Sequence, residues 1–192
     1  MPGKPIAPGE SEGPPEPWAS FLRALDDLLE EATTLHCIGG FVVTMQFGIS
    51  RTTSDIDILA AVPHRKLAQL EGMAGRGSEL GRRFKVYVQP VGIANYPENY
   101  ESRLTRMWPK LALEHLRLDA LEAHDLALTK LERNSDVDRQ DVLDLADAGF
   151  LDPTTLRDRY AKEFRPNLAA GVEKHDQTVK LWIEMCWPRE RS

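Results

Sequence analysis

Two aspartates separated by a single residue are the strongest chemical feature of this chain. Asp55 and Asp57 lie in the segment 55–61, where they alternate with Ile56 and Ile58. Because residues i and i+2 of a strand point to the same face, the two carboxylates converge on one spot. Adjacent carboxylates repel, and the usual remedy is a hard cation such as Mg²⁺ or Mn²⁺ bound through oxygen. We therefore expect both aspartates to be metal ligands, although an acidic strand facing water gives the same pattern.

A pair of glycines upstream strengthens this interpretation. Gly39 and Gly40 follow a short apolar run and precede a helical pattern. A strand that turns through two glycines into a helix leaves backbone N–H groups free, and glycine lets a phosphate approach the backbone closely. Arg51 and Thr53, just before the carboxylates, add a cation and a hydroxyl that can contact phosphate. These four residues are our candidates for nucleotide binding; an ordinary β-turn-α unit with incidental charges is the alternative.

The whole stretch resembles the signature of the DNA polymerase β-like nucleotidyltransferase superfamily. The shared pattern is Gly39-Gly40, then Gly48, then Arg51-x-Thr53-x-Asp55-Ile56-Asp57-Ile58. It is most similar to the branch of abortive-infection, toxin-type nucleotidyltransferases and their uncharacterised bacterial relatives, which implies a bacterial or archaeal source. The resemblance implies that the Gly-Gly turn holds the nucleotide phosphates and that the Asp-x-Asp pair ligates catalytic Mg²⁺.

A second stretch is similar to the same branch. Residues 124–133 and 138–145 resemble its Asp-x-x-x-x-Lys helix and its later Arg-x-x-Asp-x-x-Asp helix. Asp125 and Lys130 are five residues apart, about 140° around a helix, so they do not form an i,i+4 pair. Lys130 can then reach inward to a triphosphate, since a compact ammonium suits phosphate. Asp141 is our candidate for assisting the acceptor or fixing Lys130; for both residues, surface salt bridging is the alternative.

Composition limits the classes of protein. The apolar fraction of 42% supports a packed core, and no run of about 18 apolar residues exists to span a bilayer. With no signal peptide in the N-terminal segment, we expect a cytoplasmic protein without membrane partners. The net charge of −6 argues against a wholly basic nucleic-acid binder, but residues 61–110 hold nine Lys and Arg against four Glu. That segment could face a polyanion, or it is scattered surface charge.

The order of elements predicts an α+β fold, with a mixed nucleotidyltransferase-type sheet, flanking helices and a helical C-terminal half. Residues 1–17, rich in Pro, Gly and Glu, are predicted to be a disordered tail. Residues 18–118 form the predicted core and residues 119–192 the helical part. The predicted elements are a helix from Trp18, strand 36–38, helix 41–47, strand 55–61, helix 63–70, a loop with Gly72, Gly75 and Gly77, strands 84–91 and 110–118, and helices 122–132, 136–148, 153–163 and 168–186.

Taken together, the patterns predict an enzyme: a Mg²⁺-dependent nucleotidyltransferase that moves an NMP from an NTP to an acceptor hydroxyl. The acceptor is an RNA end or a protein, and the catalytic residues are Asp55, Asp57, Lys130 and Asp141. Such a protein could be the toxin of a toxin–antitoxin system, with an antitoxin protein as its partner. One alternative is a catalytically silent nucleotidyltransferase fold that acts as a binding or interaction protein. Another is small-molecule modification of the aminoglycoside-adenylylating kind.

The chain departs from the superfamily in one respect. Many members carry a third carboxylate on a later strand, which completes a two-metal site. The predicted strand 84–91 offers Lys85, Tyr87 and Gln89 at alternating positions but no acid, and Glu114 is the nearest alternative. We therefore expect one tightly bound metal and a weak or absent acceptor-side metal. A protein base would then serve the acceptor, with Asp141 the first choice and Glu114 the second.

Overall fold

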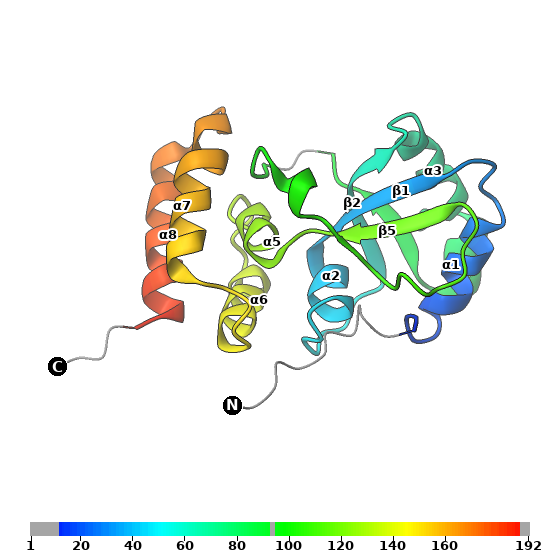
Figure 1. Cartoon of the computed structure of the whole chain (residues 1–192), viewed down its shortest axis with the longest axis horizontal. Coiled ribbons are helices and arrows are strands. Elements are labelled where there is room, and N and C mark those ends of the chain that lie inside the picture. Colours follow the sequence, from blue (N-terminus) through cyan, green and yellow to red (C-terminus); the bar gives the residue numbers. More distant parts are fainter. Residues whose placement is uncertain (1–11, 93–94, 189–192) are drawn as a thin grey trace. The chain divides into compact units, whose positions relative to one another are not determined.

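The computed structural model describes residues 12–92 and 95–188. The chain divides into two compact units whose sequences interleave. The first unit comprises residues 1–92 and 104–120, and the second comprises residues 93–103 and 121–192. Figure 1 shows the sheet in the first unit and the helices α5 to α8 in the second.

The first unit is built on a mixed sheet. Its five strands, among the described residues, lie in the order β3-β2-β1-β5-β4. Strand β1 runs antiparallel to β2 and parallel to β5, while β2 and β3 are parallel and β4 and β5 antiparallel. This mixed sheet, its helices and the helical second unit confirm the predicted α+β fold. The strands are β1 (Thr33–Ile38), β2 (Asp55–Val62), β3 (Tyr87–Pro90), β4 (Thr105–Arg106) and β5 (Leu116–Ala120).

A bulge in β2 decides which side chains share a face of the sheet. His36 pairs with Ala60 and Cys37 with Ile58, so Leu59 is the extra residue of β2. Because of it, Ala60 lies on the same face as Asp57, which pairs with Ile38. The opposite face is mainly apolar and buried. Its side chains are Leu35, Cys37, Ile56, Ile58, Ala61, Val88, Leu116, Leu118 and Ala120.

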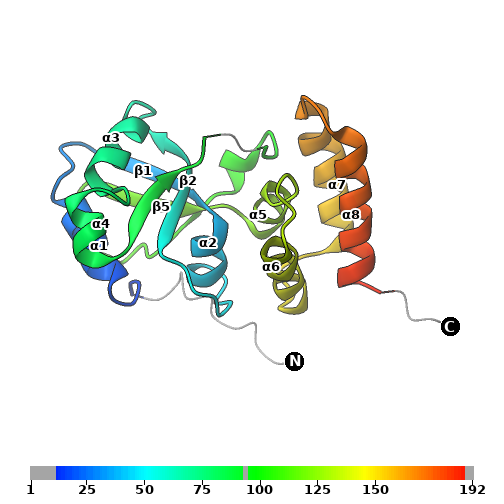
Figure 2. The same cartoon turned by 180° about the vertical axis from the view of Figure 1, so that it is seen from behind.

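Helices of the first unit cover the apolar face. They are α1 (Trp18–Asp26), α2 (Gly39–Met45), α3 (Lys66–Ala74) and α4 (Glu79–Phe84). Helix α1 buries Phe21, Leu22 and Leu25 completely, at the three- and four-residue spacing seen in the sequence. Figure 2 shows α1, α3 and α4 together beside the strands. The face that carries Asp55 and Asp57 is the more polar one.

Helix α4 corrects the prediction of a glycine loop running into a strand at residue 84. Ser78 caps this helix, because its hydroxyl accepts the N–H of Gly81 at 2.9 Å. Lys85 then ends the helix in a left-handed conformation with φ of 61°. Strand β3 therefore begins only at Tyr87.

The predicted strand 110–118 is also displaced, to Leu116–Ala120. The buried carboxylate of Asp26 accepts the N–H groups of Glu114, His115 and Leu116, at 2.8, 2.8 and 2.6 Å. Three hydrogen bonds to one carboxylate hold residues 114–116 in a tight loop at the start of β5. Asp26 takes the N–H groups of residues 114 and 115, and the strand begins at Leu116; β5 extends two residues beyond its predicted end.

The second unit is helical, as predicted. Its main elements are η2 (Tyr100–Arg103), α5 (Ala123–Thr129), α6 (Asp136–Asp147), α7 (Pro153–Arg159), the π-helical turn η3 (Tyr160–Phe164), η4 (Arg165–Asn167) and α8 (Val172–Cys186). Local signals set the helix starts: Ser135 and Asp138 form a capping box for α6, and Asp152 caps α7 with Pro153 following. Figures 1 and 2 both show α7 and α8 side by side.

A buried ion network ties residues 95–103 to the helices of the second unit. Arg103 binds both oxygens of the fully buried Asp125, at 2.8 and 3.0 Å. It also binds Glu163 at 2.8 Å, and Arg159 binds Asp125 at 3.1 Å. A buried carboxylate needs such paired donors, because an uncompensated buried charge is strongly destabilising.

The predicted N-terminal tail falls only partly within the described residues. Residues 1–11 lie outside them, whereas residues 12–17 are described and Pro14 among them is buried. In the described parts of the chain, none of the helices combines the length and apolar character that crossing a membrane requires.

Candidate functional site

The two aspartates of the motif lie at the start of β2. Asp55 is its first residue and pairs with Tyr87, and Asp57 pairs with Ile38 on one side and Gln89 on the other. Both side chains are half-buried on the polar face of the sheet. The Thr53 hydroxyl lies 3.2 Å from Asp55 Oδ1 and can donate to it. Thr53, predicted to contact phosphate, is therefore placed to orient the Asp55 carboxylate.

The glycine pair lies directly against Asp57 and Arg51. A Cβ atom on Gly39 would lie only 2.0 Å from Asp57 Oδ2, and Gly39 has a φ of +72°. A Cβ on Gly40 would lie 2.7 Å from the guanidinium carbon of Arg51. Gly39 is therefore strained by any side chain, because of its backbone conformation as well as the Asp57 contact, whereas a side chain at Gly40 would displace the Arg51 guanidinium. The structure thus brings together four of the predicted site residues, which are Gly39, Gly40, Arg51 and Asp57.

Backbone groups at this turn add to its positive character. Helix α2 begins at Gly39, and its N-cap residue is Ile38, whose side chain cannot accept a hydrogen bond. The first N–H groups of a helix have no acceptor within the helix. Thr44 on α2 contacts the carbonyl of Arg51 at 3.3 Å and so fixes the loop that carries the guanidinium. The arrangement joins N–H donors and a cation with two carboxylates, as a metal–triphosphate complex requires.

The donor set fits a metal that arrives with a phosphate-bearing substrate. Across residues 12–92 and 95–188, no three His, Cys, Asp or Glu side chains gather closely enough to form a metal cage. Mg²⁺ seldom uses such a cage: it keeps waters and typically binds through one or two carboxylates plus substrate phosphates. Asp55 and Asp57 meet that requirement.

Asp119 is the acidic residue that the sequence analysis missed. It lies on β5 and pairs with His36, which is two residues from Ile38, the partner of Asp57. Asp119 therefore shares the polar face with Asp57, with β1 between them and an offset of two residues. Burial raises the pKa of the intervening Cys37 thiol, and the charges of Asp119 and Asp57 raise it further. The alternating pattern Leu118-Asp119-Ala120 would have revealed Asp119 if the predicted strand had continued past residue 118.

Glu114 lies at the wrong end of the sheet for the role that we considered. It precedes Leu116, which pairs with Thr33 at the start of β1, whereas Asp57 pairs with Ile38 at its end. Five strand residues separate these ends by about 16 Å. The Glu114 side chain is exposed, and its backbone N–H is held by Asp26. Glu114 therefore cannot serve a reaction at Asp55 and Asp57.

Lys130 and Asp141 form a buried ion pair within the second unit. Lys130 Nζ lies 2.7 Å from Asp141 Oδ2 and 3.6 Å from Asp138 Oδ1, and all three residues are at most 5% exposed. Burial opposes ionisation of Asp138, but hydrogen bonds from Arg133 and Ser135 and the charge of Lys130 hold its pKa well below the usual range. The pair therefore joins α5 to α6 inside the helical unit and is not a surface salt bridge.

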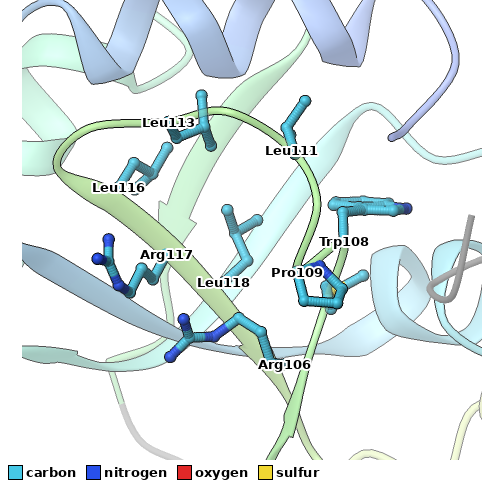
Figure 3. Close-up of a pocket in the computed structure, with 9 residues that line it drawn as sticks. Arg106, Trp108, Pro109, Leu111, Leu113, Leu116, Arg117 and Leu118 are labelled. Atoms are coloured by element: carbon cyan, nitrogen blue, oxygen red, sulfur yellow. The ribbon is translucent and has the colours of Figure 1, made fainter. Parts of the chain in front are cut away.

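Two hollows of the described surface are lined by neither the motif aspartates nor the glycine pair. One, of about 170 Å³, is enclosed by the 106–118 segment of the first unit (Figure 3) and is smaller than typical ligand pockets of about 300 Å³ or more. The other, of about 880 Å³, lies on the second unit between α7–η3 and α8. Its lining includes Tyr160, Val179 and Ile183, none of which carries a predicted role.

Comparison with known families gives a match. A family model described as a nucleotidyltransferase of unknown function (DUF6036) matches residues 20–184. The chain belongs to this family. The match spans both motif-bearing stretches of this DUF6036 protein and confirms its predicted place among nucleotidyltransferases. Neither the search of curated proteins nor that of solved structures gave a match.

Proposed function

We propose that this DUF6036 protein is a Mg²⁺- or Mn²⁺-dependent enzyme that transfers a nucleoside monophosphate from an NTP to an acceptor hydroxyl. The observation that carries the proposal is the contact of the Asp57 carboxylate with Gly39, beside the Arg51 guanidinium on Gly40. The Asp57 carboxylate, the Arg51 guanidinium and the first N–H groups of α2 lie together there. That combination suits the binding of a nucleoside triphosphate with its metal better than it suits a protein-interaction surface.

Each residue of the site has a role in this proposal. Asp55 and Asp57 would hold the metal, which neutralises the charge of the triphosphate when bound. The N–H groups of Gly39 and Gly40 and the Arg51 guanidinium bind phosphate oxygens. Thr53 orients Asp55 through the hydroxyl contact at 3.2 Å.

Lys130 and Asp141 need a different account. Asp141 holds the Lys130 ammonium at 2.7 Å, so of the two roles considered for this aspartate the structure favours fixing the lysine. Contact between Lys130 and a triphosphate requires that the phosphates compete with two buried carboxylates. We therefore propose that the pair stabilises the α5–α6 packing, with nucleotide binding by Lys130 as the competing hypothesis.

The acceptor and the biological role are the most detailed part of the proposal. Four exposed, positively charged residues lie on α4 or just beside it, namely Arg76, Arg82, Arg83 and Lys85. They favour a polyanionic acceptor such as an RNA end over a protein hydroxyl. A toxin role, with an antitoxin partner, follows from the resemblance to toxin-type enzymes and belongs with this acceptor.

The test is a transfer assay with each labelled NTP, Mg²⁺ and either total RNA or total protein. We expect label on RNA with the wild-type protein, none with Asp57→Asn, and wild-type levels with Asp27→Asn, an exposed aspartate outside the site. Absence of transfer together with absence of metal-dependent NTP binding would favour the silent-fold alternative. Label on a small molecule would favour the antibiotic-modifying one.

A further inference from the structure

Strand β3 places two polar side chains directly beside the aspartates of the motif. Tyr87 and Gln89 are the register partners of Asp55 and Asp57 on the parallel strand β2. Register partners point to the same face of a sheet, so Gln89 lies about one strand spacing, roughly 4.8 Å, from Asp57. Gln89 is exposed, and its amide makes no hydrogen bond within residues 12–92 and 95–188. An open amide therefore faces the space next to the proposed metal ligands.

The two neighbours of Asp57 belong to different parts of the site. On one side Asp57 pairs with Ile38, which leads into the glycine turn that we assign to the phosphates, and on the other it pairs with Gln89. In phosphoryl transfer the attacking oxygen and the leaving oxygen lie roughly in line, on opposite sides of the phosphorus. Phosphates bound at the glycine turn therefore leave the β3 side of the carboxylates to the acceptor.

A cation lies on the same strand, beside Asp55. The Arg76 guanidinium lies over the Tyr87 ring, 4.7 Å from its centroid, and Nη2 donates to the Tyr87 hydroxyl. Tyr87 is only 6% exposed, whereas Arg76 is exposed. In the described parts of the chain Arg76 forms no ion pair with a carboxylate. A stacked guanidinium without a carboxylate partner is suited to a phosphate group.

We propose that β3 is the acceptor-binding strand and that the acceptor is the 3′ end of an RNA strand. Gln89 binds the terminal ribose hydroxyls, because an amide both donates and accepts hydrogen bonds as a hydroxyl does. Arg76 binds a backbone phosphate of the same strand. The terminal hydroxyl oxygen forms the new bond to the α-phosphorus, the bond to pyrophosphate breaks, and the proton passes to solvent, since a neutral amide does not take it up. This inference rests on the proposed function and assigns the residues that bind its acceptor.

The experiment measures binding of a fluorescent oligoribonucleotide to the protein saturated with Mg²⁺ and a non-hydrolysable NTP, by anisotropy. We expect Gln89→Leu, which keeps the size of the side chain, to weaken binding about tenfold, as the loss of a hydrogen bond does. An oligonucleotide whose last sugar lacks both hydroxyls should bind the wild type about tenfold more weakly, and Gln89→Leu should not distinguish the two. Gln69→Leu, at an exposed position of α3, should leave both affinities unchanged.

Arg76→Gln has a different signature. It should weaken binding of both oligonucleotides equally and reduce the slope of log K against log salt concentration by about one, because it removes a phosphate contact. Calorimetry should show that the Gln89 and Arg76 variants keep the NTP affinity of the wild type within about twofold. Circular dichroism checks the fold of each variant, and Gln89→Ala replaces Gln89→Leu if the latter is unfolded.

The outcomes separate this inference from the proposed function. If a folded Gln89 variant still prefers the oligonucleotide with terminal hydroxyls, or loses NTP binding as Asp57→Asn does, the role of Gln89 is wrong. A wild-type protein that binds NTP with Mg²⁺ but neither oligonucleotide would overturn the RNA acceptor and leave the site at Asp55 and Asp57 standing. Absence of NTP binding by the wild type would reject the proposed function, and the inference with it.

Discussion

Asp57 Oδ2 lies in the space that a Cβ atom on Gly39 would need, at 2.0 Å from its position. Gly39→Ala should therefore displace the Asp57 carboxylate, besides forcing alanine into a left-handed conformation that costs about 1–2 kcal/mol. We expect lower stability and a loss of metal-dependent NTP binding, measured by urea unfolding and calorimetry. Gly149 has a φ of +77°, and a Cβ atom there would meet nothing within 4 Å, so Gly149→Ala incurs the conformational cost alone. Equal effects of the two variants on NTP binding would contradict the site.

Asp55→Asn and Asp57→Asn should abolish nucleotide transfer while leaving the fold intact. Removing one of two neighbouring like charges does not destabilise the metal-free protein and can stabilise it slightly. Transfer rates and melting temperatures of both variants check this. Near-wild-type turnover in either would show that the metal assignment is wrong.

Lys130→Met should destabilise the protein by about 3–5 kcal/mol, because it removes the ammonium that lies 2.7 Å from the buried Asp141 carboxylate. The comparison is Lys162→Met, which breaks an exposed i,i+4 pair with Asp158 and should cost at most about 0.5 kcal/mol. Urea unfolding gives both values. A Lys130 variant of normal stability but weakened NTP binding would restore the phosphate-binding hypothesis.

Acid should destabilise the second unit through Glu122 and Asp138. Burial opposes ionisation of Glu122, yet hydrogen bonding to His124 and the charge of Arg159 lower its pKa to about 2; the pKa of Asp138 is lowered too. A carboxylate with a depressed folded-state pKa stabilises the protein above its ordinary pKa, and this contribution is lost as pH falls through the folded-state value. We expect the free energy of unfolding to decrease from about pH 4.5 towards pH 2. Asp138→Asn should reduce the slope; an unchanged slope would mean that this carboxylate is not responsible.

The features that could be predicted from the sequence are those that depend on residues close together along the chain. The i, i+2 spacing of Asp55 and Asp57 fixed their common face, and the alternation around them fixed their strand. The start of β5 has a tertiary cause: Asp26, 88 to 90 residues away along the chain, holds the loop before it. Asp119 was missed because the predicted strand ended one residue too early. The contact of Arg106 with Asp119 depends on the register of β4 and β5, and the burial of Lys130 depends on helix packing. No local pattern encodes either.

The interleaving of the two units limits how the protein can be divided. Residues 93–103 belong to the helical unit, although they lie between β3 and β4 of the sheet. A fragment that stops at Leu118 would contain Arg103 but lack its partners Asp125 and Glu163. A fragment that begins there would contain Asp125 and Arg159 but lack Arg103. Neither half is thus a continuous stretch of sequence. The helical unit should therefore need the segment 93–103, either as a separate peptide or joined to it by a linker, to reach its native stability.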